Sequence, residues 1–162
     1  MVTLRAMIRQ ILIEEIDLLD VFECEDGYFA ECFKRQDRDI FVVYEGDALA
    51  GYCLLNYQPR YSLYKRLDIP EIQDVYVLDK YRQKGLATKL ITHCEDLSKK
   101  AGKQHIAVSV ALHKEAGAAQ RLYFKLGYQP DGYGVTYDRQ PVDPIKVYQI
   151  DDDLCLMMIK DL

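Results

Sequence analysis

The chain has 162 residues, 49% of them hydrophobic and 29% charged. This is the size and composition of one ordinary globular domain, and it excludes a disordered chain, a collagen-like repeat and a disulfide-rich miniprotein. Twenty-one Lys and Arg against 26 Asp and Glu leave a net charge of −5, which disfavours salt-driven nucleic-acid binding and mildly favours small or cationic partners. We therefore expect a single domain spanning residues 1–162.

The cysteines and the N-terminal segment indicate a cytoplasmic protein. The five cysteines lie far apart without a C-x-x-C pair, which is typical of reduced and mostly buried thiols. Charged residues interrupt the apolar ones near the N-terminus, so we expect neither a signal peptide nor a membrane-spanning helix there. The cysteines are Cys24, Cys32, Cys53, Cys94 and Cys155.

The first third of the chain is expected to contain a strand, two helix-like segments and a hairpin. The strand is predicted at residues 4–7, and helical spacing follows over 11–24 and 27–36. Segments 40–44 and 49–56 are rich in β-branched and aromatic residues and flank a short Glu-Gly-Asp turn, which predicts an antiparallel hairpin.

The middle of the chain predicts a strand, a helix and a second strand. After an expected polar aromatic loop at 58–70, residues 71–78 (EIQDVYVL) have apolar side chains at Ile72, Val75 and Val77. A helix with one apolar face follows and stops at a glycine, and residues 106–110 (IAVSV) form a short buried strand. This order predicts a right-handed crossover between parallel strands. The apolar face consists of Leu86, Leu90, Ile91, Cys94 and Leu97.

The last third predicts a further helix and two strands. The helix covers 115–126 and ends at Gly127, and a strand begins at Tyr128. The final strand is expected at 154–159, and the stretch 132–153 is longer than loops usually are unless they bind something. The expected fold is therefore α/β: a mixed, mostly antiparallel sheet with a parallel pair in its middle and flanking helices.

The segment VYVLDKYRQKGLATKL carries the strongest chemical signal. It joins a buried strand to a helix whose start contains Arg82, Lys84, Gly85, Ala87 and Thr88. The N-terminus of a helix has a partial positive charge and unpaired N–H groups, so it normally attracts acidic residues and a Ser, Thr, Asp or Asn cap. Two cations at this position predict a bound anion, and the small residues would let a phosphate approach the backbone amides.

Other phosphate-binding classes lack the residues they require. There is no G-x-x-x-x-G-K-[ST] and no G-x-G-x-x-G after a strand, which excludes a P-loop nucleoside triphosphatase and a dinucleotide-binding Rossmann domain. The histidines have neither an i, i+4 pairing on a helix nor a neighbouring Cys/His cluster, so no metal site is expected. Structural roles are expected for the histidines, with His113 as the exception because it lies at the end of the predicted strand 106–110.

Two motifs in order resemble the GCN5-related N-acetyltransferase (GNAT) superfamily. The run YRQKGLAT is similar to the R/Q-x-x-G-x-G/A pyrophosphate loop of that family, with Ala87 in place of its last glycine. The run AAQRLYFKLGY, residues 118–128, is similar to the A-x-x-x-Y-x-x-x-G-F/Y signature on the next helix. The order of strands and helices also fits, so the resemblance extends over essentially the whole chain.

The resemblance implies that the chain binds acetyl-CoA or another acyl-CoA between two splayed parallel strands. The backbone of Val75, Tyr76 and Val77 would pair with the pantetheine amides as an added strand does. The pyrophosphate would be held by backbone amides at the start of the helix together with two basic side chains. The residues matched to this role are Arg82, Gln83, Lys84, Gly85, Leu86, Ala87 and Thr88.

The resemblance also implies a general acid for the acyl transfer. Tyr123 occupies the family's tyrosine position, where its hydroxyl would protonate the departing thiolate. For the base we favour Glu71 over Asp74, which strand alternation would place on the opposite face. Some family members carry a glutamate on the next parallel strand, where this chain has Ser109. A water chain to Glu71, or an acceptor amine of low pKa, could therefore replace a dedicated general base.

The expected activity is acetyl transfer from acetyl-CoA to a primary amine, preferably of a small molecule. Protein N-termini, lysine side chains, polyamines, aminoglycosides and amino-acid-like metabolites all remain open as acceptors. The contrasting alternative is a non-catalytic acyl-CoA-binding or interaction module on the same fold. Nucleic acid and membranes are not expected as partners, and a homodimer remains possible.

Overall fold

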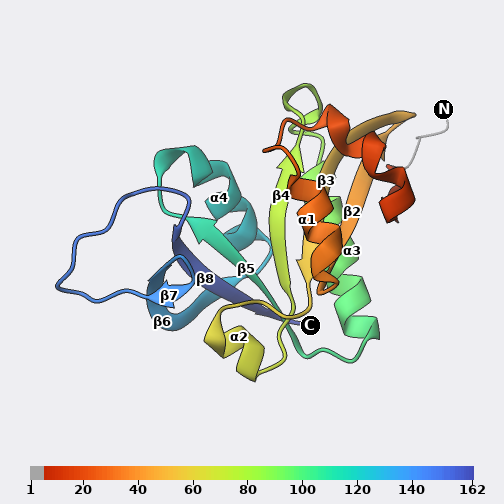
Figure 1. Ribbon diagram of the computed structural model, residues 1–162. Helices are drawn as coiled ribbons and strands as arrows, with labels where there is room; N and C mark the ends of the chain where they lie inside the picture. The colour runs from red at the N-terminus through yellow and green to blue at the C-terminus, as the bar shows by residue number, and fades with distance from the viewer. Residues whose placement is uncertain (1–5) are drawn as a thin grey trace. The chain divides into compact units, whose positions relative to one another are not determined.

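The computed structural model describes residues 6–162, and the chain divides into two compact units. The first comprises the described residues up to Tyr57 together with Ile72–Leu97, and the second comprises Gln58–Glu71 together with Ser98–Leu162. Each unit contains strands and helices, so the chain is of the mixed α/β class (Figure 1). The prediction of one domain stays a prediction.

The first unit is built on four strands in the order β1-β2-β3-β4. β1 pairs antiparallel with β2, and β2 pairs antiparallel with β3 as the predicted hairpin, whose turn is Gly46-Asp47. The strands are β1 (Ile8–Gln10), β2 (Arg38–Glu45), β3 (Ala48–Asn56) and β4 (Glu71–Val77). The helices are η1 (Ile13–Val21, a 3-10 helix), α1 (Tyr28–Arg35), η2 (Asp79–Tyr81) and α3 (Leu86–Lys100).

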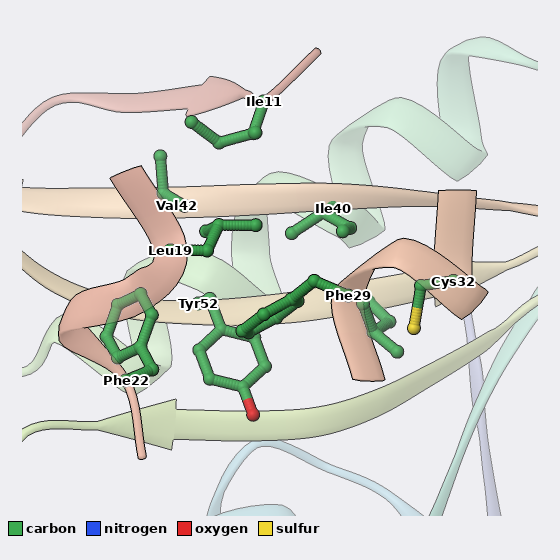
Figure 2. Close-up of a cluster of buried hydrophobic side chains, with 9 residues drawn as sticks. Ile11, Leu19, Phe22, Phe29, Cys32, Ile40, Val42 and Tyr52 are labelled. Atoms are coloured by element: carbon green, nitrogen blue, oxygen red, sulfur yellow. The ribbon is translucent and has the colours of Figure 1, made fainter. Parts of the chain in front are cut away.

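Strand alternation divides the side chains of β2 and β3 between two helical layers. On one side, Ile40, Val42, Tyr52 and Leu54 join residues of η1 and α1 in a buried apolar cluster (Figure 2). On the other side, Phe41 stacks edge-on against His93 of α3, with ring centroids 5.0 Å apart, and the Cys53 and Cys94 sulfur atoms of β3 and α3 lie 3.6 Å apart. The sheet of the first unit is therefore covered on both faces.

The apolar stripe predicted for residues 86–97 is confirmed in α3. Leu86, Leu90, Ile91 and Cys94 are each no more than 2% exposed. The helix ends before Gly102, whose φ of +81° requires a residue that accepts the left-handed conformation. Leu97, the last residue predicted for this face, is only partly buried, so hydrophobic burial holds the helix on the sheet from Leu86 to Cys94.

The second unit has an antiparallel sheet in the order β5-β8-β6-β7. Tyr64 of α2 is fully buried, and its hydroxyl donates to the carbonyl oxygens of Val108 and Met158 at 3.3 and 3.0 Å, which fixes the helix on this sheet. The strands are β5 (His105–Ala111), β6 (Gln129–Tyr137), β7 (Gln140–Pro141) and β8 (Leu154–Asp161). The helices are α2 (Ser62–Arg66), η3 (Lys114–Ala116, a 3-10 helix) and α4 (Gly117–Lys125).

Four expectations about local structure are corrected. Residues 4 and 5 of the predicted first strand lie outside the described residues, 6 and 7 are not in a strand, and the strand that forms is Ile8–Gln10. The predicted loop at 58–70 contains α2, and only the part of 11–24 within η1 is helical, as a 3-10 helix. The predicted loop at 132–153 is instead largely the β6–β7 hairpin followed by a long connection to β8 (Figure 1).

The two strands expected to form the splayed parallel pair are β4 and β5. All of β4 after its first residue belongs to the first unit, and β5 belongs to the second. The helix predicted between them is α3, and the helix predicted after β5 is α4. The order of elements is therefore the expected one.

Candidate functional site

Strand β4 contains a β-bulge at Asp74. Asp74 has a φ of +51°, a left-handed conformation that Asp tolerates better than most residues. Gln73 contacts Arg38 and Asn56 of β2 and β3, and the next residue, Asp74, accepts a hydrogen bond from Tyr28 of α1. Two consecutive side chains therefore face the same helical layer, which is the signature of an extra residue in a strand.

The bulge changes the predicted relation between the two carboxylates of β4. Glu71 and Asp74 were expected on opposite faces from simple alternation, which the bulge at Asp74 interrupts, so their opposite placement stays a prediction. Asp74 is exposed, whereas Glu71 has no exposed surface. The two carboxylates of β4 therefore differ in exposure, and Glu71 is not a solvated side chain at the end of the strand.

Tyr28 and Asp74 form a polar contact at the bulge. Burial and, next, the charge of Asp74 raise the pKa of Tyr28 far above its usual range. Tyr28 therefore remains protonated and donates its hydrogen to the Asp74 carboxylate. The contact ties the start of α1 to the bulge of β4.

Beyond the bulge, β4 lies unusually close to β3. A Cβ placed on Gly51 of β3 would lie 2.5 Å from the Tyr76 carbonyl oxygen, so only glycine fits. Tyr76 packs edge-on against Phe22, with centroids 6.2 Å apart, and Val77 is buried. Val75, Tyr76 and Val77, the predicted pantetheine-binding residues, thus form a backbone segment held rigidly by its neighbours.

The predicted pyrophosphate loop connects η2 to α3 through two left-handed residues. Gln83 and Gly85 have φ values of +61° and +76°. A Cβ built on Gly85 would meet no atom of the described residues within 4 Å apart from its chain neighbours. In the part of the chain that the structure describes, the first backbone N–H of α3 with a carbonyl partner is that of Lys89, which donates at 3.0 Å to the oxygen of Gly85, the residue before the helix. Within residues 6–162, the N–H groups of Gly85, Leu86, Ala87 and Thr88 have no carbonyl partner.

The two cations of this loop already have carboxylate partners, which the sequence did not predict. Arg82 lies 3.0 Å from Asp79 and also donates to the Val77 oxygen, and Lys84 lies 3.3 Å from Glu45. All four side chains are at least one-third exposed, so these ion pairs are weak and can exchange for another anion. The carboxylate partners therefore explain the two cations without a ligand, and the expected anion site depends on the backbone amides at the start of α3.

The loop fits a pyrophosphate. No acidic residue lies in the first turn of α3, four consecutive amides have no carbonyl partner among residues 6–162, and the glycine leaves the backbone uncovered. Helix N-termini of this kind bind phosphate oxygens through their N–H groups and partial positive charge. Among the residues that the structure describes, no cluster of His, Cys, Asp or Glu has the arrangement of a metal site.

Tyr123, the predicted acid, lies on α4 in the second unit. It is 7% exposed, and its ring contacts that of Tyr128 with centroids 5.9 Å apart. The Tyr128 N–H donates to the Tyr123 carbonyl and closes the turn after α4 at Gly127. The side chain is thus buried in the unit and held by a second aromatic ring.

Glu71 forms an ion pair that the sequence did not predict. Its carboxylate accepts a hydrogen bond from Arg139, a residue 68 positions later in the turn between β6 and β7. Arg139 and the preceding Asp138 both have positive φ, +64° and +46°, in a turn that favours Asn-Gly. A left-handed arginine is strained, so this turn holds an unfavourable backbone while placing Arg139 on the buried carboxylate.

His113, at the end of β5, lies between two carboxylates. Its Nε2 atom is 2.6 Å from Asp152 and its Nδ1 atom is 3.2 Å from Glu115. The hydrogen bond to Asp152 is the main cause that raises the pKa of His113 above the usual value. The histidine therefore links the connection before β8 to the start of η3.

The predicted site residues fall into two groups. The first unit holds Val75–Val77 and residues 82–88, and the second holds Glu71 and Tyr123. Sequence reasoning missed Tyr28 and Arg139 as partners of the β4 carboxylates. A signal for the bulge was present, because the apolar residues Ile72, Val75 and Val77 are spaced by three and then by two.

Comparison with known proteins agrees with the motifs. The model of the acetyltransferase (GNAT) family matches residues 6–128. A Bacillus subtilis acetyltransferase in complex with CoA is 20% identical, with a TM-score of 0.67 over 98% of this chain and 99% of the other. An Elizabethkingia anophelis GNAT acetyltransferase with acetyl-CoA bound is 13% identical, with a TM-score of 0.68 over 99% and 100%.

A third structure of the same fold is an IAA acetyltransferase from Bacillus cereus. It is 18% identical, with a TM-score of 0.68 over 97% of this chain and 99% of the other. At these identities the likeness shows the fold. Comparison with curated proteins gives no match. Within the described part of the chain, no helix combines the length and the apolar character needed to cross a bilayer.

Proposed function

Because the chain belongs to the acetyltransferase (GNAT) family, we propose that it transfers an acetyl group from acetyl-CoA directly to a primary amine of a small molecule. The observation that carries the proposal is the row of amides from Gly85 to Thr88 at the start of α3, which have no carbonyl partner in the described part of the chain. Two structures of the same fold hold CoA or acetyl-CoA, which supports the choice of cofactor. The five free cysteines support a cytoplasmic location.

Residues of the first unit would hold the cofactor. The amides of residues 83–88 would bind the pyrophosphate, with Arg82 and Lys84 exchanging their exposed carboxylate partners for phosphate oxygens. The backbone of Val75–Val77 would pair with the pantetheine amides. When bound, acetyl-CoA supplies a thioester whose acetyl carbon bonds to the amine nitrogen as the carbon–sulfur bond breaks and the amine proton passes to sulfur.

Two side chains are proposed for proton handling. Tyr123 would donate to the departing sulfur, since a phenol of pKa ~10 protonates a thiolate whose acid has a pKa of ~8.5 at a modest cost. Glu71 is a poorer direct base than expected, because its carboxylate is fully buried and bonded to Arg139. We keep Glu71 as a residue that acts through ordered water, and Asp74 is the exposed carboxylate of the same strand.

A thiol-release assay with acetyl-CoA and a panel of amines tests the proposal. We expect thiol release with at least one primary amine, and Tyr123→Phe to lower kcat about 100-fold or more without changing the Kd for CoA. Tyr128→Phe is the matched control, because it removes a hydroxyl from the adjacent ring and leaves the proposed acid intact.

The alternative is an acyl-CoA-binding module without catalysis. The pairing of Glu71 with Arg139 favours it, because this pair occupies the expected base. Binding of CoA with no thiol release for any amine in the panel would support the alternative. Unchanged turnover in Tyr123→Phe would remove Tyr123 from the mechanism.

A further inference from the structure

Glu71 places a carboxylate in the interior of the second unit. The residue is 0% exposed, and among the described residues 6–162 it is the only charged residue that is buried. A carboxylate removed from water needs a cation or several hydrogen-bond donors, because burial disfavours the charged form. The guanidinium of Arg139 supplies a cation to this carboxylate.

Arg139 reaches Glu71 from a strained two-residue turn. Asp138 and Arg139 separate β6 from β7 and have φ values of +46° and +64°. Such a turn needs a left-handed conformation at both positions, which Asn-Gly adopts at little cost and arginine does not. The strain is thus located where a side chain pairs with the buried carboxylate, and strained backbone of this kind is concentrated at functional sites.

Weak contacts attach the outer part of the turn to the rest of the second unit. Strand β7 has two residues, and the ladder between β6 and β8 is interrupted between Pro130 and Val135. The N–H of Asp138 donates to the Asp153 oxygen at 3.0 Å, and the Asp138 carboxylate lies 2.7 Å from Arg60. The two side chains of that ion pair are 57% and 60% exposed, so the pair adds little stability. The turn can therefore move without unfolding the sheet of the second unit.

Arg139 covers the Glu71 carboxylate on its solvent side. The side chain of Arg139 is 22% exposed, whereas that of Glu71 is 0% exposed. Burial, opposed by the charge of Arg139, raises the pKa of Cys155 to about 11, and burial followed by the charge of Glu71 raises the pKa of Tyr64. Both neighbours are therefore uncharged at neutral pH and do not compete for the arginine. Withdrawal of Arg139 would open a negatively charged position to solvent.

We propose that Arg139 is an internal competitor, which occupies Glu71 in the free protein and is displaced by the ammonium group of the acceptor. This inference rests on the proposed acetyl transfer, in which the acceptor is a primary amine. Such an amine has a pKa of ~10.4 and enters as an ammonium, which is more compact than a guanidinium and carries the same charge. Exchange of one cation for the other leaves no buried charge unpaired, so Arg139 can leave at low cost.

The competition lowers the apparent affinity for the acceptor. A site that is free in only a fraction of the molecules has its apparent dissociation constant raised by the inverse of that fraction. If Arg139 occupies Glu71 in about 70–97% of the molecules, the KM for the acceptor is about 3- to 30-fold higher than without the competitor. Removal of Arg139 should therefore strengthen acceptor binding while it weakens the fold. A purely structural role would not combine these two effects.

Chemical rescue of Arg139→Gly tests the cation-binding position without cofactor or activity. Glycine accepts the φ of +64° and leaves room for a cation from solution. We expect millimolar ethylguanidinium chloride to raise the Tm of this variant by about 2 °C or more, compared with sodium chloride at equal ionic strength. Wild type should show a smaller shift because Arg139 competes, and Arg139→Gly combined with Glu71→Gln should show none.

The same measurement covers a variant that folds poorly. If Arg139→Gly does not fold alone, ethylguanidinium should restore its circular dichroism signal, because a ligand of the native state shifts the folding equilibrium. Failure to restore the signal would refute the cation-binding position, as would an unchanged Tm in a folded variant.

Steady-state kinetics with an amine found in the thiol-release assay tests the competition. Arg139→Gly should lower the acceptor KM about 3- to 30-fold with a smaller change in kcat, and ethylguanidinium should inhibit this variant competitively against the amine. The matched control is Lys146→Gly, which removes a cation of the second unit that pairs with Asp143 and should leave the acceptor KM as in wild type. An acceptor KM that stays the same or rises in Arg139→Gly would overturn the inference.

These outcomes separate the inference from the proposed function. Thiol release with an unchanged acceptor KM in Arg139→Gly would reject the competition and leave the acetyltransferase proposal standing. Rescue by ethylguanidinium without thiol release for any amine would reject both the acetyltransferase proposal and the competition. In that case Glu71 would remain a cation-binding position filled by Arg139.

Discussion

Replacing Arg139 by Met should destabilise the protein more than most single substitutions. The change leaves the Glu71 carboxylate, which has no exposed surface, without its arginine. Breaking a buried ion pair on one side costs about 3–5 kcal/mol. The Arg139 side chain is 22% exposed, so we expect the lower end, about 3 kcal/mol, or a fall in Tm of about 6–12 °C for a chain of this size.

Two further variants separate charge pairing from backbone strain. Arg139→Gly should lose about 1 kcal/mol less than Arg139→Met, because glycine accepts the φ of +64° without strain. Glu71→Leu combined with Arg139→Met removes both charges and should recover most of the loss. Glu71→Leu, Arg139→Met and the variant that carries both changes form a double-mutant cycle. We expect a coupling free energy of about 2 kcal/mol between the two positions.

Urea unfolding followed by circular dichroism measures these differences, since the chain has no tryptophan. A coupling below about 0.5 kcal/mol would mean that the two residues act independently. In that case the buried carboxylate would be satisfied by its other surroundings, and the reasoning from the ion pair would be wrong. A coupling near the expected value would confirm that the pairing of Glu71 with Arg139 stabilises the fold.

Three other substitutions test separate parts of the molecule. Gly85→Asp should abolish the thermal stabilisation by CoA, whereas the neutral Gly85→Asn, which also tolerates the φ of +76°, should retain part of it. Gly51→Ala should cost about 1–3 kcal/mol in urea unfolding, because its Cβ would meet the Tyr76 oxygen, and an unchanged midpoint would contradict the close approach of β3 and β4. By NMR, His113 should titrate above its ordinary value of 6.5 and nearer to it in Asp152→Asn. Because the pKa is raised on folding, the stabilisation by His113 is complete below pH ~6.5 and disappears as the pH rises through the folded value.

The sequence predicts those parts of the fold that depend on local pattern. The β2–β3 hairpin follows from two β-branched runs around a glycine turn, and α3 follows from an apolar face at helical spacing. α2 was missed because it has only five residues and is held in place by the contacts of Tyr64 with strands far along the chain. Tertiary contacts, rather than helix propensity, determine such a segment.

The candidate site, like the fold, is predictable where it depends on local spacing and not where it depends on contacts between residues far apart in the sequence. The glycine and the small residues of the pyrophosphate loop are recognisable from local spacing, and the structure gives them the expected left-handed turn and unpaired amides. The pairing of Glu71 with Arg139 could not be predicted, because it joins residues 68 positions apart through a turn that has no Asn or Gly. The ion pairs of Arg82 and Lys84 were missed because alternation and spacing do not report which carboxylate a long side chain reaches.

The bulge in β4 also determines which length changes this strand can accept. Deleting Asp74 would restore simple alternation and leave every later side chain of the strand on its present face, whereas deleting Val75 would turn the later side chains over, so that Val77 would exchange its buried place with Tyr76. A deletion beyond the bulge therefore acts on the whole downstream half of the strand and on the loop that follows it. In this part of the strand the number of residues matters as well as their type, because a strand shortened after the bulge would present a different backbone edge to its ligand.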